Sequence, residues 1–162
     1  MKHSLSLPFV GFAILVLVLQ TFIPGFSLGG EKIVPDLLLI FMVYAGLLYG
    51  RFSSILIGFG FGLVQDFASH FEIIGAMAFT KSLTGFGLGS LALYRTVWPP
   101  IIRALIVTSI FLLHFLLFFF IKFNGTPAST ALLFQVAILH TLVGIIILWI
   151  LDKAIIRNLF SR

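Results

Sequence analysis

Three ionisable side chains in an apolar stretch are the residues of this chain best able to do chemistry. Asp36, Asp66 and Lys81 lie in a segment from Pro35 to Ser90 that is otherwise almost wholly apolar. An ionisable group on a membrane helix is costly unless it is paired, and it marks a candidate functional site. The sequence therefore predicts a packed apolar segment that contains a few buried ionisable residues.

Each of these carboxylates stands beside a predicted helix end. Asp36 follows Pro35 where an apolar helix starts, so we expect it to cap free backbone N–H groups there. Asp66 ends the next predicted helix, where a negative charge suits the helix dipole poorly. We expect Lys81, in the following helix, to compensate Asp66. A structural ion pair is the favoured interpretation, and a ligand or ion site is the alternative.

The other polar residues do not form a known catalytic grouping. His114 and His140 each fall near the middle of a predicted helix, and we expect either to form a hydrogen bond between helices. Two histidines with no nearby carboxylate do not make a metal site. The sequence shows no Ser/His/Asp grouping, no phosphate loop and no cysteine. We therefore predict a protein that is not an enzyme and that has no cofactor or metal.

Helix-spaced glycines recur through the same segment. Glycines four residues apart clear one face of a helix for close packing against another helix. We expect ordinary internal packing at these pairs, with contact to a partner's helix as the alternative. Gly60 and Gly87 lie off those faces and thin the opposite side of their helices. The pairs are Gly46 and Gly50, Gly58 and Gly62, and Gly85 and Gly89.

Composition excludes a soluble domain. Of the 162 residues, 60% are hydrophobic and 9% are charged, and the mean hydropathy is +1.22. Such a chain cannot build a polar surface, so its excess apolar area must face lipid. The net charge of +5 fits loops that set membrane orientation and touch anionic membrane lipid. We predict no nucleic-acid partner.

Six stretches are long enough, some marginally, to cross a hydrocarbon core of about 30 Å. Only Arg51 and Phe52 separate the second from the third, which favours a tight helical hairpin. The predicted fold is an all-α integral membrane protein, a compact bundle of six transmembrane helices in a single domain over residues 1–162. The spans are Leu5–Ile23, Val34–Gly50, Ser53–Ala68, Ile73–Tyr94, Ile101–Ile121 and Ala131–Leu151.

The basic residues predict the orientation. Six spans place both termini on one side of the membrane, and the positive-inside rule makes that side the cytoplasm. Only Lys32 and Lys122 would then lie outside, with Lys81 inside a span. The basic residues on the cytoplasmic side would be Lys2, Arg51, Arg95, Arg103, Lys153, Arg157 and Arg162.

The order of motifs in this segment resembles the family of the rod shape-determining protein MreD. The resemblance rests on P-D-L-L-L at Pro35–Leu39, Y-x-x-x-x-x-G at Tyr44–Gly50 and G-x-x-x-G-L-x-x-D at Gly58–Asp66. Gly75 and the region of Gly85 continue the pattern. Lys81 departs from the family's commoner pattern, in which an apolar or hydroxyl residue often stands at that place.

The resemblance implies a function without catalysis. MreD-like proteins are bacterial inner-membrane scaffolds of the elongasome that bind MreC. They work with MreB, RodA and its transpeptidase partner in peptidoglycan synthesis. The family is also similar to the substrate-binding subunits of energy-coupling-factor importers, so a small-molecule-binding subunit is the alternative function. Those subunits carry an A-x-x-x-A motif in their first helix, whereas here Ala13 is followed four residues later by Leu17.

Overall fold

A computed structural model describes residues 7–28, 31–68, 73–94, 96–124 and 130–156. The described chain is mostly helical and also contains one small antiparallel hairpin, in which Ser27 faces Lys32. Its elements are α1 (Leu7–Phe22), β1 (Phe26–Leu28), β2 (Glu31–Ile33), α2 (Leu37–Ala68), α3 (Ala76–Tyr94), α4 (Pro100–Lys122), α5 (Thr130–Leu151) and a short π-helical turn, η1 (Asp152–Ile156).

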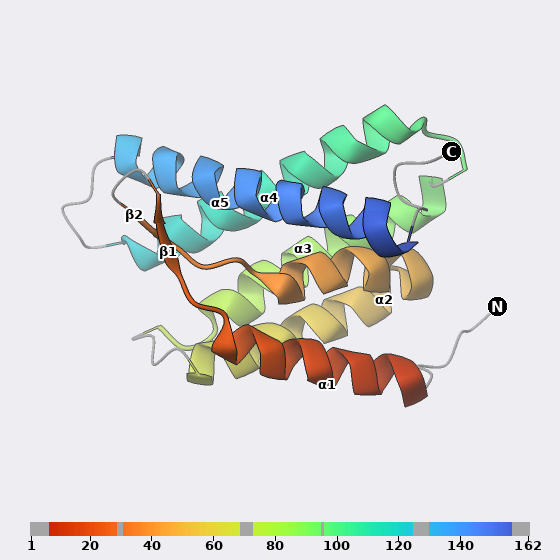
Figure 1. Ribbon diagram of the computed structural model, residues 1–162, viewed down its shortest axis with the longest axis horizontal. Coiled ribbons are helices and arrows are strands. Elements are labelled where there is room, and N and C mark those ends of the chain that lie inside the picture. Colours follow the sequence, from red (N-terminus) through yellow and green to blue (C-terminus); the bar gives the residue numbers. More distant parts are fainter. Residues whose placement is uncertain (1–6, 29–30, 69–72, 95, 125–129, 157–162) are drawn as a thin grey trace.

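The helix count differs from the prediction. The described residues form five α-helices rather than six, because the predicted spans 34–50 and 53–68 join into the single element α2. Gly50 interrupts α2 with φ 75° and ψ −168°, a backbone conformation that glycine adopts at little cost. The chain reverses there, and the second half of α2 returns alongside the first (Figure 1). The predicted hairpin is therefore present, with its turn at Gly50.

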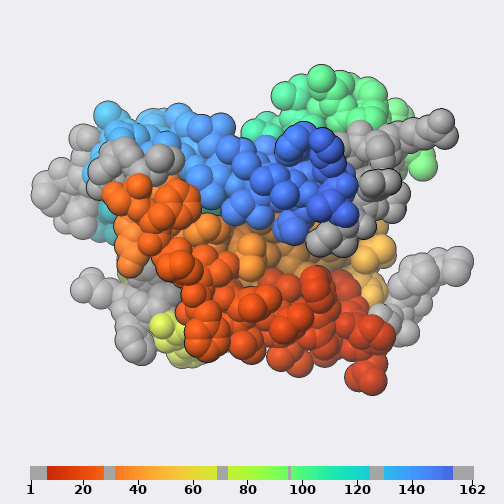
Figure 2. Space-filling view, viewed as in Figure 1, coloured from red at the N-terminus to blue at the C-terminus, as the bar shows by residue number. Residues whose placement is uncertain are grey.

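The elements run between two ends of an elongated bundle. The start of α1, the reversal of α2 and η1 lie at one end, here called the Gly50 end (Figure 1). The β-hairpin, the end of α2 and the start of α5 lie toward the other, here called the Asp36 end, and α2 starts partway along the bundle (Figure 1). Figure 2 shows α1 and α5 on one face with part of α2 between them.

The exterior is suited to lipid. Three helices are long and apolar enough to cross a membrane, namely Leu37–Ala68, Pro100–Lys122 and Thr130–Ala154, and α1 is a shorter apolar helix. Large apolar side chains such as Phe52 and Ile101 are exposed by 73% and 70%. In water such a surface would be unfavourable, whereas in hydrocarbon it is not. The chain is therefore a multi-pass membrane protein.

The core lies between the first half of α2 and the helices around it. Leu39 and Met42 of α2, Leu88 of α3 and Phe111 of α4 are each no more than 1% exposed. Leu148 of α5 is equally buried. The first half of α2 is thus surrounded by protein.

Candidate functional site

Asp36 caps the start of α2, as the sequence predicts. Its Oδ1 accepts a hydrogen bond from the N–H of Leu39 at 3.0 Å, and its backbone carbonyl accepts one from the N–H of Ile40 at 3.3 Å. The first contact satisfies one of the N–H groups that a helix start leaves free, and the second is the first backbone hydrogen bond of the helix itself. Asp36 is only 7% exposed, so its second carboxylate oxygen also needs a partner.

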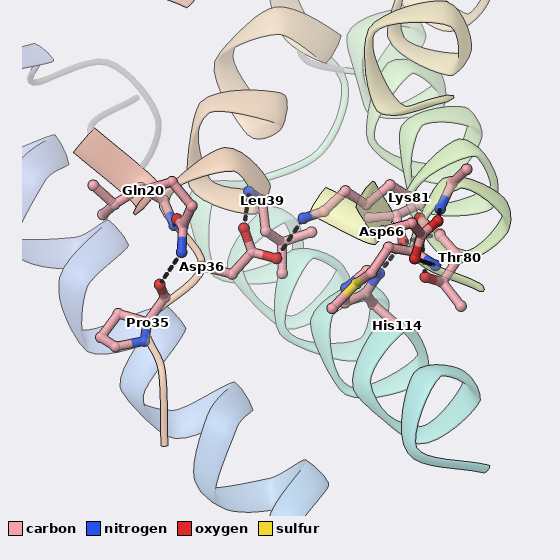
Figure 3. Close-up of polar contacts among 12 residues, drawn as sticks. Gln20, Pro35, Asp36, Leu39, Asp66, Thr80, Lys81 and His114 are labelled. Atoms are coloured by element: carbon pink, nitrogen blue, oxygen red, sulfur yellow. Dashed lines mark hydrogen bonds and ion pairs between the residues drawn. The ribbon is translucent and has the colours of Figure 1, made fainter. Parts of the chain in front are cut away.

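Lys81 of α3 is that partner. Its Nζ donates to Oδ2 of Asp36, and the lysine itself is fully buried (Figure 3). The predicted ion pair between Lys81 and Asp66 is therefore wrong. The first half of α2 lies against α3, so the lysine meets the carboxylate at the start of α2 rather than the one at its end.

Asp66 instead caps the start of α3. It is 1% exposed, and its two carboxylate oxygens accept hydrogen bonds from the N–H groups of Gly75, Met77 and Ala78, each at 3.0 Å. A carboxylate at its own helix's C-terminus suits the dipole poorly, but the same charge suits the N-terminus of the neighbouring helix. Asp66 is thus compensated by backbone dipoles, with no ion pair among the described residues.

His114 connects α4 to α3. Its Nδ1 lies 2.9 Å from Oγ1 of Thr84, and that hydroxyl donates its own hydrogen to the carbonyl of Thr80 at 2.7 Å. The hydroxyl must therefore accept from His114, which places the histidine proton on Nδ1. This confirms the predicted hydrogen bond between helices. Nε2 of His114 is buried without a partner in the described residues.

Within the described part of the chain, the hydrogen bond of His140 stays inside its own helix. Its Nδ1 contacts the carbonyl of Val136 at 2.9 Å, four residues earlier in α5. Its ring packs on Phe115 and Phe119 of α4, with centroids 5.2 and 5.0 Å apart. Within the described chain, no three histidine, cysteine, aspartate or glutamate side chains come together to hold a metal ion.

Gln20 of α1 joins Asp36 and Lys81 in a polar junction at the start of α2, although the sequence pattern did not single it out. Its amide nitrogen donates to the carbonyl of Pro35 at 3.0 Å, and its amide oxygen accepts from the N–H of Leu37 at 2.7 Å. The amide of α1 therefore fastens the chain on both sides of Asp36 (Figure 3). A lone amide near the end of an apolar helix was the available signal.

The glycine pairs of α2 and α3 pack against each other. A Cβ added at Gly58 would lie 2.4 Å from the carbonyl oxygen of Lys81, and one at Gly62 would lie 2.4 Å from Cα of Ala78. Both contacts are to backbone, which cannot move aside as a flexible side chain can. Because these glycines have no side chain, the backbones of α3 and the second half of α2 lie in close contact.

The other two glycines serve the same interface from α3. A Cβ at Gly85 would lie 2.3 Å from the carbonyl oxygen of Ser54, and one at Gly89 would lie 2.6 Å from Cα of Arg51. Internal packing, the favoured interpretation, thus accounts for all four predicted site glycines. It leaves no space on these faces for a partner's helix.

Gly60 differs from them, because a Cβ there would meet nothing within 4 Å. It lies in an almost wholly apolar groove of about 220 Å³ between α1 and the second half of α2. The groove is lined by Phe9, Val10, Ala13, Ile14, Leu17, Ile57, Gly60 and Phe61.

The apolar exterior, the helices able to cross a membrane and the buried polar groups define a polytopic helical membrane protein. The family model of the rod shape-determining protein MreD matches residues 3–158 of the 162-residue chain, so the chain belongs to the MreD family. Neither the curated proteins nor the solved structures contain a match. The predicted similarity to importer subunits is therefore not confirmed.

Proposed function

We propose that this chain is a non-enzymatic scaffold of the bacterial elongasome that binds MreC and helps to position peptidoglycan synthesis. MreB, RodA and its transpeptidase partner would be reached indirectly through that complex. The observation that carries the proposal is the MreD family match over nearly the whole chain. The fold agrees with it, since the buried polar groups form helix caps and helix-to-helix contacts.

The proposed setting is the bacterial cytoplasmic membrane, with both termini in the cytoplasm. Among the described residues, Arg51, Arg103 and Lys153 belong to the Gly50 end, near the start of α1 and the end of η1 (Figure 1). The positive-inside rule supports this end as the cytoplasmic one. Lys2, Arg95, Arg157 and Arg162, which the sequence analysis counted on the same side, lie outside the described residues.

The Gly60 groove is the proposed docking place for the single membrane-spanning helix of MreC. Helices associate in lipid by close van der Waals contact, and an open glycine permits such an approach. Gly60 offers this opening on the outside of the α2–α3 pair, whereas Gly58 and Gly62 are already covered by α3. The groove is apolar along both walls, which suits a helix in hydrocarbon.

The test is co-purification of MreC with glycine variants of the full chain. Gly60→Leu is expected to keep the yield of monodisperse protein and to lower the amount of MreC that co-purifies. Gly11→Leu is the matched control, because Gly11 of α1 also meets nothing within 4 Å and does not line the groove. Wild-type MreC recovery in both variants would exclude the groove as the docking place. No MreC recovery with the wild-type chain would refute the proposed function itself.

A further inference from the structure

A second cavity lies at the Asp36 end of the bundle and differs from the Gly60 groove in being partly polar. Its volume is about 460 Å³, within the range of about 300–1,000 Å³ usual for small-molecule sites. Residues of α1, β2, α2, α3, α4 and α5 contribute to it, together with residues of the connecting segments. They are Gln20, Thr21, Ile23, Lys32, Val34, Asp36, Gln65, Ala68, Met77, Phe115, Phe118, Phe119, Lys122 and His140.

The charged groups of this cavity favour an anion. Asp36 is already paired with Lys81, so its negative charge is compensated from within the protein. The other charged lining residues described are Lys32 and Lys122. Nζ of Lys122 lies 5.8 Å from the ring centroid of Phe119, which holds the ammonium group beside the aromatic wall. The described lining therefore contributes two lysines and one carboxylate that is already paired, so its formal charge favours an anionic group.

The uncharged polar groups favour hydroxyls on the ligand. Oε1 of Gln65 is buried and has no hydrogen-bond partner among the described residues. His140 uses Nδ1 on the carbonyl of Val136, and since a carbonyl only accepts, the proton is on Nδ1 and the neutral ring keeps an acceptor at Nε2. Gln65 and His140 thus bring an amide and an imidazole to the lining of one cavity, and a ligand hydroxyl that reaches the Gln65 amide would supply its missing partner.

The remaining wall is apolar. Phe115, Phe118 and Phe119 of α4 follow one another along the cavity, and Met77 of α3 adds a flexible thioether. Aromatic and methionine side chains bind hydrocarbon well and adapt to its shape. The cavity therefore offers cations, acceptors and a hydrocarbon surface together.

We propose that this cavity binds a phosphoglycerol group, since that group combines negative charge with free hydroxyls. Where a lipid carries the group, its apolar stem would lie against the aromatic wall. The source is either an anionic membrane lipid with this head group or a soluble glycerol phosphate. The site is separate from the Gly60 groove, so it does not depend on the proposed binding of MreC.

Native mass spectrometry of the full chain tests the proposal, after exposure to an equimolar mixture of phosphatidylglycerol and phosphatidylcholine. The wild-type chain is expected to retain one phosphatidylglycerol in preference to phosphatidylcholine. Lys32→Gln and Lys122→Gln should each lower that preference by about fivefold, the usual effect of one basic residue near anionic lipid. Lys153→Gln is the charge-matched control, because Lys153 lies over Trp149 and does not line the cavity.

Gln65→Leu separates binding in the cavity from attraction to surface charge, since it removes an acceptor and leaves every cation. It is expected to lower phosphatidylglycerol retention while the monodisperse yield stays unchanged. Displacement of the lipid by glycerol phosphate, or binding of glycerol phosphate in its place, would assign the site to the soluble source; retention against it would assign the site to lipid. The proposal is overturned if the chain retains the two lipids equally and does not bind glycerol phosphate. It is also overturned if Lys153→Gln loses as much preference for phosphatidylglycerol as the two cavity variants do.

Discussion

Lys81 and Asp36 form a buried ion pair although 45 residues separate them in the chain. The pair ties α3 to the first residue before α2, at the point where Gln20 of α1 also holds the chain. Side chains of α1 and α3 therefore bind the chain at and beside Asp36, where α2 starts. Because Lys81 is fully buried and Asp36 is only 7% exposed, each charged group depends largely on the other for compensation.

Separating this pair is expected to destabilise the protein. Lys81→Met leaves the Asp36 carboxylate uncompensated, and Asp36→Asn leaves the ammonium group uncompensated while an N-cap side chain is retained. Each single change should cost about 3–5 kcal/mol, the range for breaking a buried pair in soluble proteins. The measurement is thermal stability in detergent, and both single variants should melt below the wild type.

The double variant Asp36→Asn with Lys81→Met supplies the control. It removes both charges, so it should melt above either single variant. If the two losses simply add, the residues are not coupled and the buried ion pair does not stabilise the fold.

The sequence located these polar residues but did not identify their partners. Helix ends can be read from Pro35, Asp36 and the glycines, because capping and breaking are local effects. Which helix lies beside which is a long-range property, and Asp36 and Asp66 are equally plausible partners for Lys81 in a linear sequence. The structure resolves this because α3 packs along both halves of α2.

Asp66 is expected to act independently of that pair. Asp66→Ala removes three hydrogen bonds from the start of α3 and should cost about 1–2 kcal/mol, as for a lost helix cap. Combined with Lys81→Met, its effect should show a smaller coupling energy than the combination of Asp36→Asn with Lys81→Met. Thermal melting of the three single variants, the two double variants and the wild type measures both couplings, and a larger coupling for Asp66 would contradict the assignment.

The glycines of the α2–α3 interface should be needed for folding. Gly62→Leu and Gly85→Leu place side chains where backbone atoms already lie 2.4 and 2.3 Å from a Cβ, so the helices would have to separate. Overpacking of this kind typically costs about 1–3 kcal/mol and sometimes more. Size-exclusion chromatography in detergent should show a low monodisperse yield for both. Gly60→Leu is the in-helix comparison and should behave as the wild type.

The glycine spacing predicted close packing correctly at Gly46 and at the two later pairs, but it was wrong for Gly50, which forms the reversal and meets nothing within 4 Å. It also could not say which faces are covered. Gly58 and Gly60 are two residues apart in the same helix, and only the first meets a neighbouring backbone. Sequence spacing defines a face of a helix, whereas the partner of that face depends on how the hairpin at Gly50 folds back.

The membrane orientation can be tested with single cysteines, because the chain has none of its own. Ser27 of β1 lies at the Asp36 end and Thr96 lies after α3 at the Gly50 end, and both are exposed. With the termini in the cytoplasm, a membrane-impermeant maleimide added to intact spheroplasts should label Ser27→Cys and leave Thr96→Cys unlabelled. Both should react after permeabilisation, which controls for reactivity. The sequence alone also predicts labelling from outside at Thr126 and protection at Ser161, but both residues lie outside the described part of the chain. Labelling of Thr96→Cys in intact spheroplasts, with Ser27→Cys protected, would reverse the proposed orientation.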